Sequence, residues 1–152
     1  MAELKLTPHL VVADGDRAIA FYRAAFGAVE RSRHQDGGGK IVHADLALGG
    51  HAFSLADEFP EWNALGPLQR GGTSVVMTIE VDQGVDELWA QGLAAGGTVV
   101  YPLADQFYGA RSGRLADPFG HQWLITMPTE VVSNEEIDRR MLAWEQAQKA
   151  KD

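Results

Sequence analysis

One order of elements, a strand, a helix and then three strands, occurs twice in this 152-residue sequence. The first set covers about residues 4–57 and the second about residues 74–127. The clearest match pairs Gly50-His51-Ala52-Phe53 with Gly120-His121-Gln122-Trp123, about 70 residues further on. The sequence therefore predicts an α+β protein of two βαβββ modules. We expect each module to bury one sheet face under its helix, while the other faces curl around a shared concave site.

Hydrophobic spacing and turn residues predict the elements of each module. Helices are expected over residues 14–27 and 84–95. Strands are expected over these ranges: 4–12, 28–34, 40–48, 51–57, 74–82, 98–101, 111–116 and 121–127. Residues 58–72, rich in Gly and Pro, predict a linker or lid. A capping box of Ser133 and Glu136 predicts a last helix over about 133–150, and residues 1–152 are expected to form one domain.

Composition excludes several classes of function. The chain has 13 Lys and Arg against 21 Asp and Glu, a net charge of −8, which argues against nucleic acid and anionic membranes as partners. The same charge favours a cationic ligand by steering it. The chain has no cysteine, so thiolate chemistry and disulfides are excluded. Without a membrane-spanning run or a signal-peptide pattern, we expect a cytoplasmic protein.

Period-two alternation assigns side chains to the two faces of the first sheet. A Gly49-Gly50 turn predicts that Leu46 opposes Phe53 on an apolar face beneath the helix. His43, Asp45 and, on the first strand, His9 then share the opposite, concave face. These three residues are candidates for ligand contacts, for a displaced metal site, or for a His–Asp general base.

Three further candidates lie in loops. Trp62, Tyr108 and Arg111 offer aromatic and cationic groups of the kind that hold a flat or anionic ligand. The alternative is loop packing, with Arg111 or Arg114 paired with Asp117 to brace the last hairpin.

Three segments, "DGDRAIAFYRAAFGA" (14–28), "GGHAFSLADE" (49–58) and "YGARSGRLADPFGHQW" (108–123), carry a family resemblance. Over about residues 4–127 the sequence resembles the vicinal oxygen chelate superfamily, which includes glyoxalase I, bleomycin resistance proteins, fosfomycin-resistance enzymes and extradiol dioxygenases. The resemblance implies a cup-shaped, glyoxalase-like sheet and a homodimer. For the metal enzymes of this superfamily, the resemblance also implies one divalent ion, held by His, Gln or Glu.

The resemblance places those metal ligands at four positions of this sequence. The residues found there are Thr7, Ser54, Leu124 and, on the fifth strand, Val75 or Val76. Hydroxyl and aliphatic side chains do not form the nitrogen- and oxygen-rich site that such a metal requires.

The sequence therefore predicts a protein of the bleomycin-resistance kind, which takes up a drug or a metabolite in a concave pocket without a metal. The expected ligand contacts are His9, His43, Asp45, Trp62, Tyr108 and Arg111. The alternative is a lyase, isomerase or dioxygenase of the glyoxalase type, with one divalent ion bound by His9, His43 and Asp45.

Overall fold

The computed structural model describes residues 1–152 and contains two βαβββ modules, as predicted. The elements of the first module are β1 (His9–Val12), α1 (Gly15–Phe26), β2 (Val29–Gln35), β3 (Ile41–Leu48) and β4 (His51–Asp57). Those of the second module are β5 (Val76–Glu80), α3 (Val85–Ala95), β6 (Thr98–Gln106), β7 (Ala110–Ala116) and β8 (Gln122–Pro128). The segment between the modules holds η1 (Pro60–Trp62) and α2 (Pro67–Arg70), and α4 (Asn134–Lys149) ends the fold.

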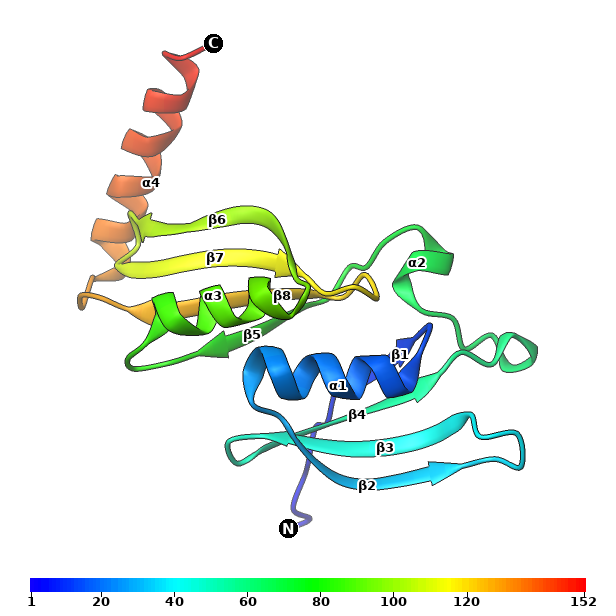
Figure 1. The fold of residues 1–152 in the computed structure, drawn as a ribbon. Coiled ribbons are helices and arrows are strands. Elements are labelled where there is room, and N and C mark those ends of the chain that lie inside the picture. The colour runs from blue at the N-terminus through cyan, green and yellow to red at the C-terminus, as the bar shows by residue number, and fades with distance from the viewer.

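The two sheets have the same topology. Each has four strands, in the order β1-β4-β3-β2 and β5-β8-β7-β6. In each sheet the first strand is parallel to the fourth, and the other pairs are antiparallel. Leu46 lies opposite Phe53, which confirms the predicted register of the first hairpin. Figure 1 shows α1 in front of one sheet and α3 in front of the other, and the two helices are in contact.

One hydrophobic core joins the modules on this helix side. The Trp123 ring from β8 packs against the rings of both Phe26 and Tyr22 from α1, with centroids 4.9 and 5.3 Å away. The Tyr22 hydroxyl donates to Asp117 over 2.5 Å, and the Trp123 indole N–H donates to the same carboxylate over 2.9 Å. His121 adds a further link between the modules, with its Nε2 2.9 Å from the carbonyl oxygen of Val11. The other oxygen of this buried carboxylate accepts from the backbone N–H groups of Phe119 and His121 in its own turn, so Asp117 is fully hydrogen-bonded and its bond to Tyr22 joins the modules.

Three strands differ clearly in length from the prediction. The fifth strand was expected over residues 74–82, but β5 covers only Val76–Glu80. The first strand was expected to begin at residue 4, but β1 begins at His9, and Leu4 and Leu6 are 86% and 91% exposed. Their alternating pattern is that of a strand, but no strand pairs with them. Conversely, β6 continues to Gln106 rather than ending before Pro102. A register shift between Tyr101 and Ala104 accommodates this proline, since β6 is an edge strand.

The last helix forms as predicted but buries none of its residues. The Ser133 side chain accepts a hydrogen bond from the Glu136 backbone, which caps the helix. The Trp144 ring lies 5.9 Å from that of Phe107, and Arg140 donates to the Phe107 carbonyl oxygen. The rest of α4 extends away from the sheets (Figure 1). Neither α4 nor any other helix combines the length and the apolar character needed to cross a membrane.

Candidate functional site

The face of the first sheet that points away from α1 carries a cluster of polar side chains. Register places His9 on β1 beside Ser54 on β4, and Ser54 beside Asp45 on β3. His43 lies two residues before Asp45 on the same strand, so it points to the same side. The structure therefore brings together three of the predicted site residues, His9, His43 and Asp45. We call these residues, with Ser32 and Ser54, the histidine cluster.

Each side chain of the histidine cluster has a partner within it. His9 Nδ1 lies 2.7 Å from Ser54 Oγ, and His43 Nε2 lies 3.0 Å from Asp45 Oδ1. Ser32 Oγ donates to the other oxygen of Asp45 over 3.0 Å. The His9 and His43 rings stack, with centroids 5.5 Å apart and planes 11° from parallel. Ser32 was not among the predicted site residues, because the sequence does not show which residue of β2 pairs with Asp45.

The environment sets the charge on the cluster. The pKa of His9 is lowered, mainly because its ring is desolvated where it packs against its neighbours. The nearby His43 lowers this pKa further, whereas Asp45 raises it. Hydrogen bonds from His43 and then from Ser32 lower the pKa of Asp45. Side chains of His43 and Asp45 are 44% and 49% exposed, so both are open to a ligand. The cluster therefore presents a fixed carboxylate beside imidazole groups that can donate or accept hydrogen bonds.

The histidine cluster does not fit a divalent metal ion. An imidazole donates to a metal through a lone pair in the plane of its ring. The nearly parallel His9 and His43 rings direct their lone pairs along separate planes. One nitrogen of each ring is already hydrogen-bonded, to Ser54 and to Asp45. No group of three or more His, Asp or Glu side chains is placed to share an ion anywhere in residues 1–152.

The positions that the family resemblance gives for metal ligands offer no better donor set. The Ser54 hydroxyl is hydrogen-bonded to His9. Leu124 on β8 has an aliphatic side chain, and its neighbour on β5 is Thr78, which does not supply a carboxylate or imidazole. Val76, also on β5, pairs with Gln122. Thr7 precedes β1 and is exposed.

The other three predicted site residues lie apart from the histidine cluster, and no hydrogen bond or ring contact connects them to it. Trp62 in η1 is 69% exposed and stacks on Phe59, with ring centroids 4.9 Å apart. Tyr108 lies in the turn between β6 and β7, edge-on to the Phe107 ring. A ligand contact by either aromatic side chain remains a prediction.

Arg111 was grouped with the loop candidates, although a strand was expected to begin with it at residue 111. It lies on β7, with its guanidinium bound to Asp86 and Asp105. The alternative of a brace between Arg111 or Arg114 and Asp117 is wrong, because Asp117 binds Tyr22 and Trp123 instead. Arg111 therefore faces the α3 side of the sheet, and a ligand would have to replace Asp86.

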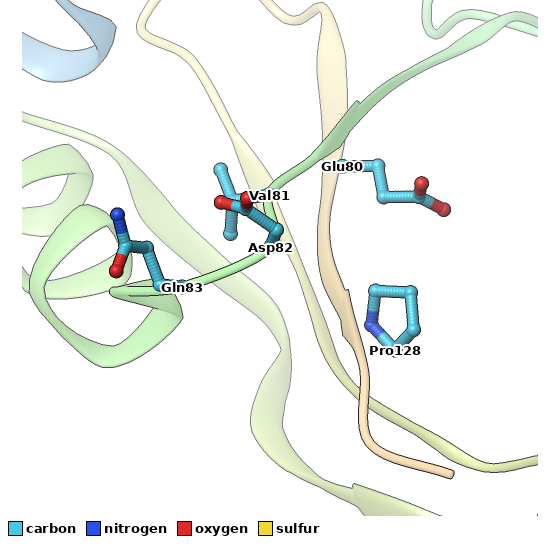
Figure 2. Close-up of a pocket in the computed structure, with 5 residues that line it drawn as sticks. All are labelled: Glu80, Val81, Asp82, Gln83 and Pro128. Atoms are coloured by element: carbon cyan, nitrogen blue, oxygen red, sulfur yellow. The ribbon is translucent and has the colours of Figure 1, made fainter. Parts of the chain in front are cut away.

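Two hollows lie outside the histidine cluster. A cleft of ≈ 950 Å³ between the modules is lined by residues 5–8, the turn at 48–53 and part of β5. A smaller hollow of ≈ 660 Å³ lies where β5 ends. Figure 2 shows that the carboxyl groups of Glu80 and Asp82 there point away from each other, so they do not converge on one ligand. The larger cleft has the volume of a small-molecule site.

Comparison with known proteins agrees with this fold. The sequence profile of the Glyoxalase/Bleomycin resistance protein/Dioxygenase superfamily matches residues 6–125. The uncharacterized protein Mb0911c of Mycobacterium bovis is 42% identical over 142 residues, which are 91% of this chain and 93% of the relative. TioX from Micromonospora sp. ML1 has a TM-score of 0.65 at 30% identity, covering 83% of this chain and 99% of that chain. The genomically encoded fosfomycin resistance protein FosX from Listeria monocytogenes has a TM-score of 0.67 over 90% of this chain and 99% of that chain; its 18% identity shows the fold alone.

Proposed function

Because the chain belongs to the Glyoxalase/Bleomycin resistance protein/Dioxygenase superfamily, we propose that it binds a small organic molecule, a drug or a metabolite, without a divalent metal ion. The histidine cluster carries this proposal. It places exposed hydrogen-bonding groups on a sheet face that no helix covers, and it lacks the convergent lone pairs of a metal site. His9, His43 and Asp45 are the proposed contacts. Trp62 and Tyr108, which lie apart from the histidine cluster, are proposed as separate ligand contacts on their own loops.

Binding is tested with a panel of aromatic and cationic compounds, followed by isothermal titration calorimetry and tryptophan fluorescence. We expect His43→Ala and Asp45→Ala to weaken binding by about tenfold each, as loss of a hydrogen bond to a charged group does. His51→Ala is the matched control, because His51 is an exposed histidine on β4 that lines the cleft between the modules. If His51→Ala were the only variant to weaken binding, the ligand site would be assigned to that cleft instead. No binding across the panel would contradict the proposal.

Absence of a metal is tested by elemental analysis of protein purified without a histidine tag. We expect less than a stoichiometric amount of any divalent ion. One tightly held ion per chain, lost in His9→Ala or His43→Ala, would instead support a metal-dependent lyase, isomerase or dioxygenase with atypical ligands.

The hydrogen bond between His43 and Asp45 favours a second candidate function, metal-free proton transfer. The carboxylate orients the ring through Nε2, which leaves Nδ1 free to take a proton from a bound molecule. The test is exchange of carbon-bound protons of bound panel compounds in D2O, followed by NMR. Exchange that His43→Ala abolishes would support catalysis, and binding without exchange would leave binding as the function.

We also propose that the protein acts in the cytoplasm as a homodimer. Exposed Leu4 and Leu6 precede β1, and exposed Val75 precedes β5, where each strand forms the edge of its sheet. Unpaired edges beside exposed apolar residues favour association with a second chain. Sedimentation equilibrium tests this, and a monomer at micromolar concentration would contradict it.

A further inference from the structure

The open face of the second sheet carries one arginine, Arg114, that was predicted only as a possible brace for the last hairpin. Arg114 lies on β7, opposite Leu124 on β8 and Tyr101 on β6. The next residue, Leu115, is fully buried in the core on the α3 side. Since neighbours on a strand point to opposite faces, Arg114 points to the face that no helix covers. Its side chain is half-buried, and Tyr101 and Leu124 beside it are partly exposed.

The hydrogen-bonding capacity of Arg114 is largely unused. Its Nε is buried and has no hydrogen-bond partner. Its Nη1 makes one contact, to Gln122 Oε1 at 3.4 Å, near the outer limit for a hydrogen bond. The guanidinium also lies over the Tyr101 ring, 5.3 Å from the centroid. These contacts hold the group in place but do not satisfy its donors.

An arginine without a carboxylate partner is unexpected at a half-buried position of this protein. The chain has 21 acidic residues against 13 basic ones, and Arg33, Arg111, Arg139 and Arg140 each pair with at least one carboxylate. No carboxylate lies within 4.0 Å of Arg114, which forms none of the ion pairs. A buried charged donor without a partner destabilises the fold. A partner from outside the chain would account for its presence.

We infer that Arg114 binds the oxyanion group, a carboxylate or a phosphate, of an organic ligand. This rests on the proposed function, that the protein binds a small organic molecule, and adds a contact on the second sheet and the chemical class that it takes. The planar guanidinium forms paired hydrogen bonds with such oxygens, and stacking on Tyr101 limits the entropy lost on binding. Leu124 offers an apolar surface beside it for the rest of the molecule. The local geometry thus favours an anion, whereas the net charge of −8 alone favoured a cation.

The probes are benzoate, phenyl phosphate and the neutral benzamide. We expect both anions to bind the wild-type protein at least about tenfold more tightly than benzamide, and to shift the NMR signal of Arg114 Nε–H. A preference between benzoate and phenyl phosphate distinguishes a carboxylate from a phosphate ligand. Equal binding of the neutral and anionic probes would overturn the inference.

Arg114→Met keeps an unbranched side chain against Tyr101 and removes the charge. We expect it to weaken anion binding by about tenfold or more. Arg33→Met is the matched control, because Arg33 is also a strand arginine but is held by Glu30 and Asp16 on the helix side of the first sheet. It should leave anion binding unchanged.

Stability separates binding from a structural role. Without ligand, Arg114→Met should melt at the same temperature as the wild type or higher, because an unpaired charge is removed. A melting temperature well below that of Arg33→Met would show that Arg114 serves the fold, and would overturn the inference. Panel compounds that bind with no dependence on Arg114 would overturn it and leave the proposed function standing. If no compound binds at all, both fall.

Discussion

The two modules place opposite charges at the same position. Asp45 pairs with Ser54 across the first hairpin, and Arg114 pairs with Leu124 across the second. On the other side, Asp45 pairs with Ser32 and Arg114 with Tyr101. Topology and register thus fix where the polar side chain stands. The residue at that position decides whether the face presents a carboxylate or a guanidinium.

The modules differ as well in how completely their helices are buried. Seven residues of α1 are buried, including Tyr22 and Phe26, but only Val85 and Gly92 of α3. Met77, Ile79 and Leu88 in the second module pack against the core but remain partly exposed. The first module therefore contributes more of the burial that stabilises the chain, and the second leaves apolar surface beside the cleft between the modules.

The largest effect is expected where the two modules meet. Trp123→Ala should destabilise the protein by about 4 kcal/mol, because it leaves a cavity among the rings of α1 and removes a donor to Asp117. Urea denaturation measures the change. Trp144→Ala is the control, since Trp144 on α4 is 48% exposed, and it should change stability by less than about 1 kcal/mol. Similar losses in both variants would show that the shared core is not the main source of stability.

Much of this core could be predicted from local patterns. The Gly49-Gly50 turn and period-two alternation gave the register of β3 and β4, and the apolar spacing of α1 gave its buried face. Alternation shows which face a residue occupies but not whether a neighbouring strand exists. For that reason β1 was expected to begin at Leu4, although the structure pairs it only from His9.

Like the core, the candidate site could be predicted as far as strand period determines which side chains share a face. His9, His43 and Asp45 share a face because of strand period alone, and the structure brings them into contact. The partners of the arginines were not predictable, because they depend on tertiary approach. Arg111 meets Asp86, 25 residues earlier in the chain. Arg114 contacts no carboxylate, and the sequence does not show which acidic residues are too distant to pair with it.

The unequal burial of the modules is tested by one substitution in each. Leu55→Ala in β4 removes a side chain that is 0% exposed and should destabilise the protein by about 3 kcal/mol. Leu88→Ala in α3 removes a partly exposed side chain beside the cleft and should lose only about 1 kcal/mol. Both are measured by urea denaturation at a concentration where the oligomeric state is known. Equal losses would mean that the two modules are buried alike in solution, with a second chain covering α3.

The smallest effect concerns acid, and its step just below pH 6.5 should arise in the first module. The pKa of His9 is lowered in the folded protein, chiefly by desolvation, so the folded state binds fewer protons than the unfolded state just below the ordinary value of 6.5. Stability should therefore decrease as the pH falls through this range. The pKa of Asp45 is also lowered, by hydrogen bonds from His43 and Ser32, so a second decrease should follow below 3.8.

Register makes Thr78 the counterpart of His9, because His9 pairs with Ser54 and Thr78 with Leu124. His9→Thr therefore gives the first module the residue of the second at this position. The variant should lose the decrease in melting temperature just below pH 6.5 but keep the one below pH 3.8, since Asp45 retains its bonds to His43 and Ser32. An unchanged profile between pH 7 and 5 would assign the acid sensitivity to another group. In that case, desolvation of His9 would not be one of the differences between the two modules.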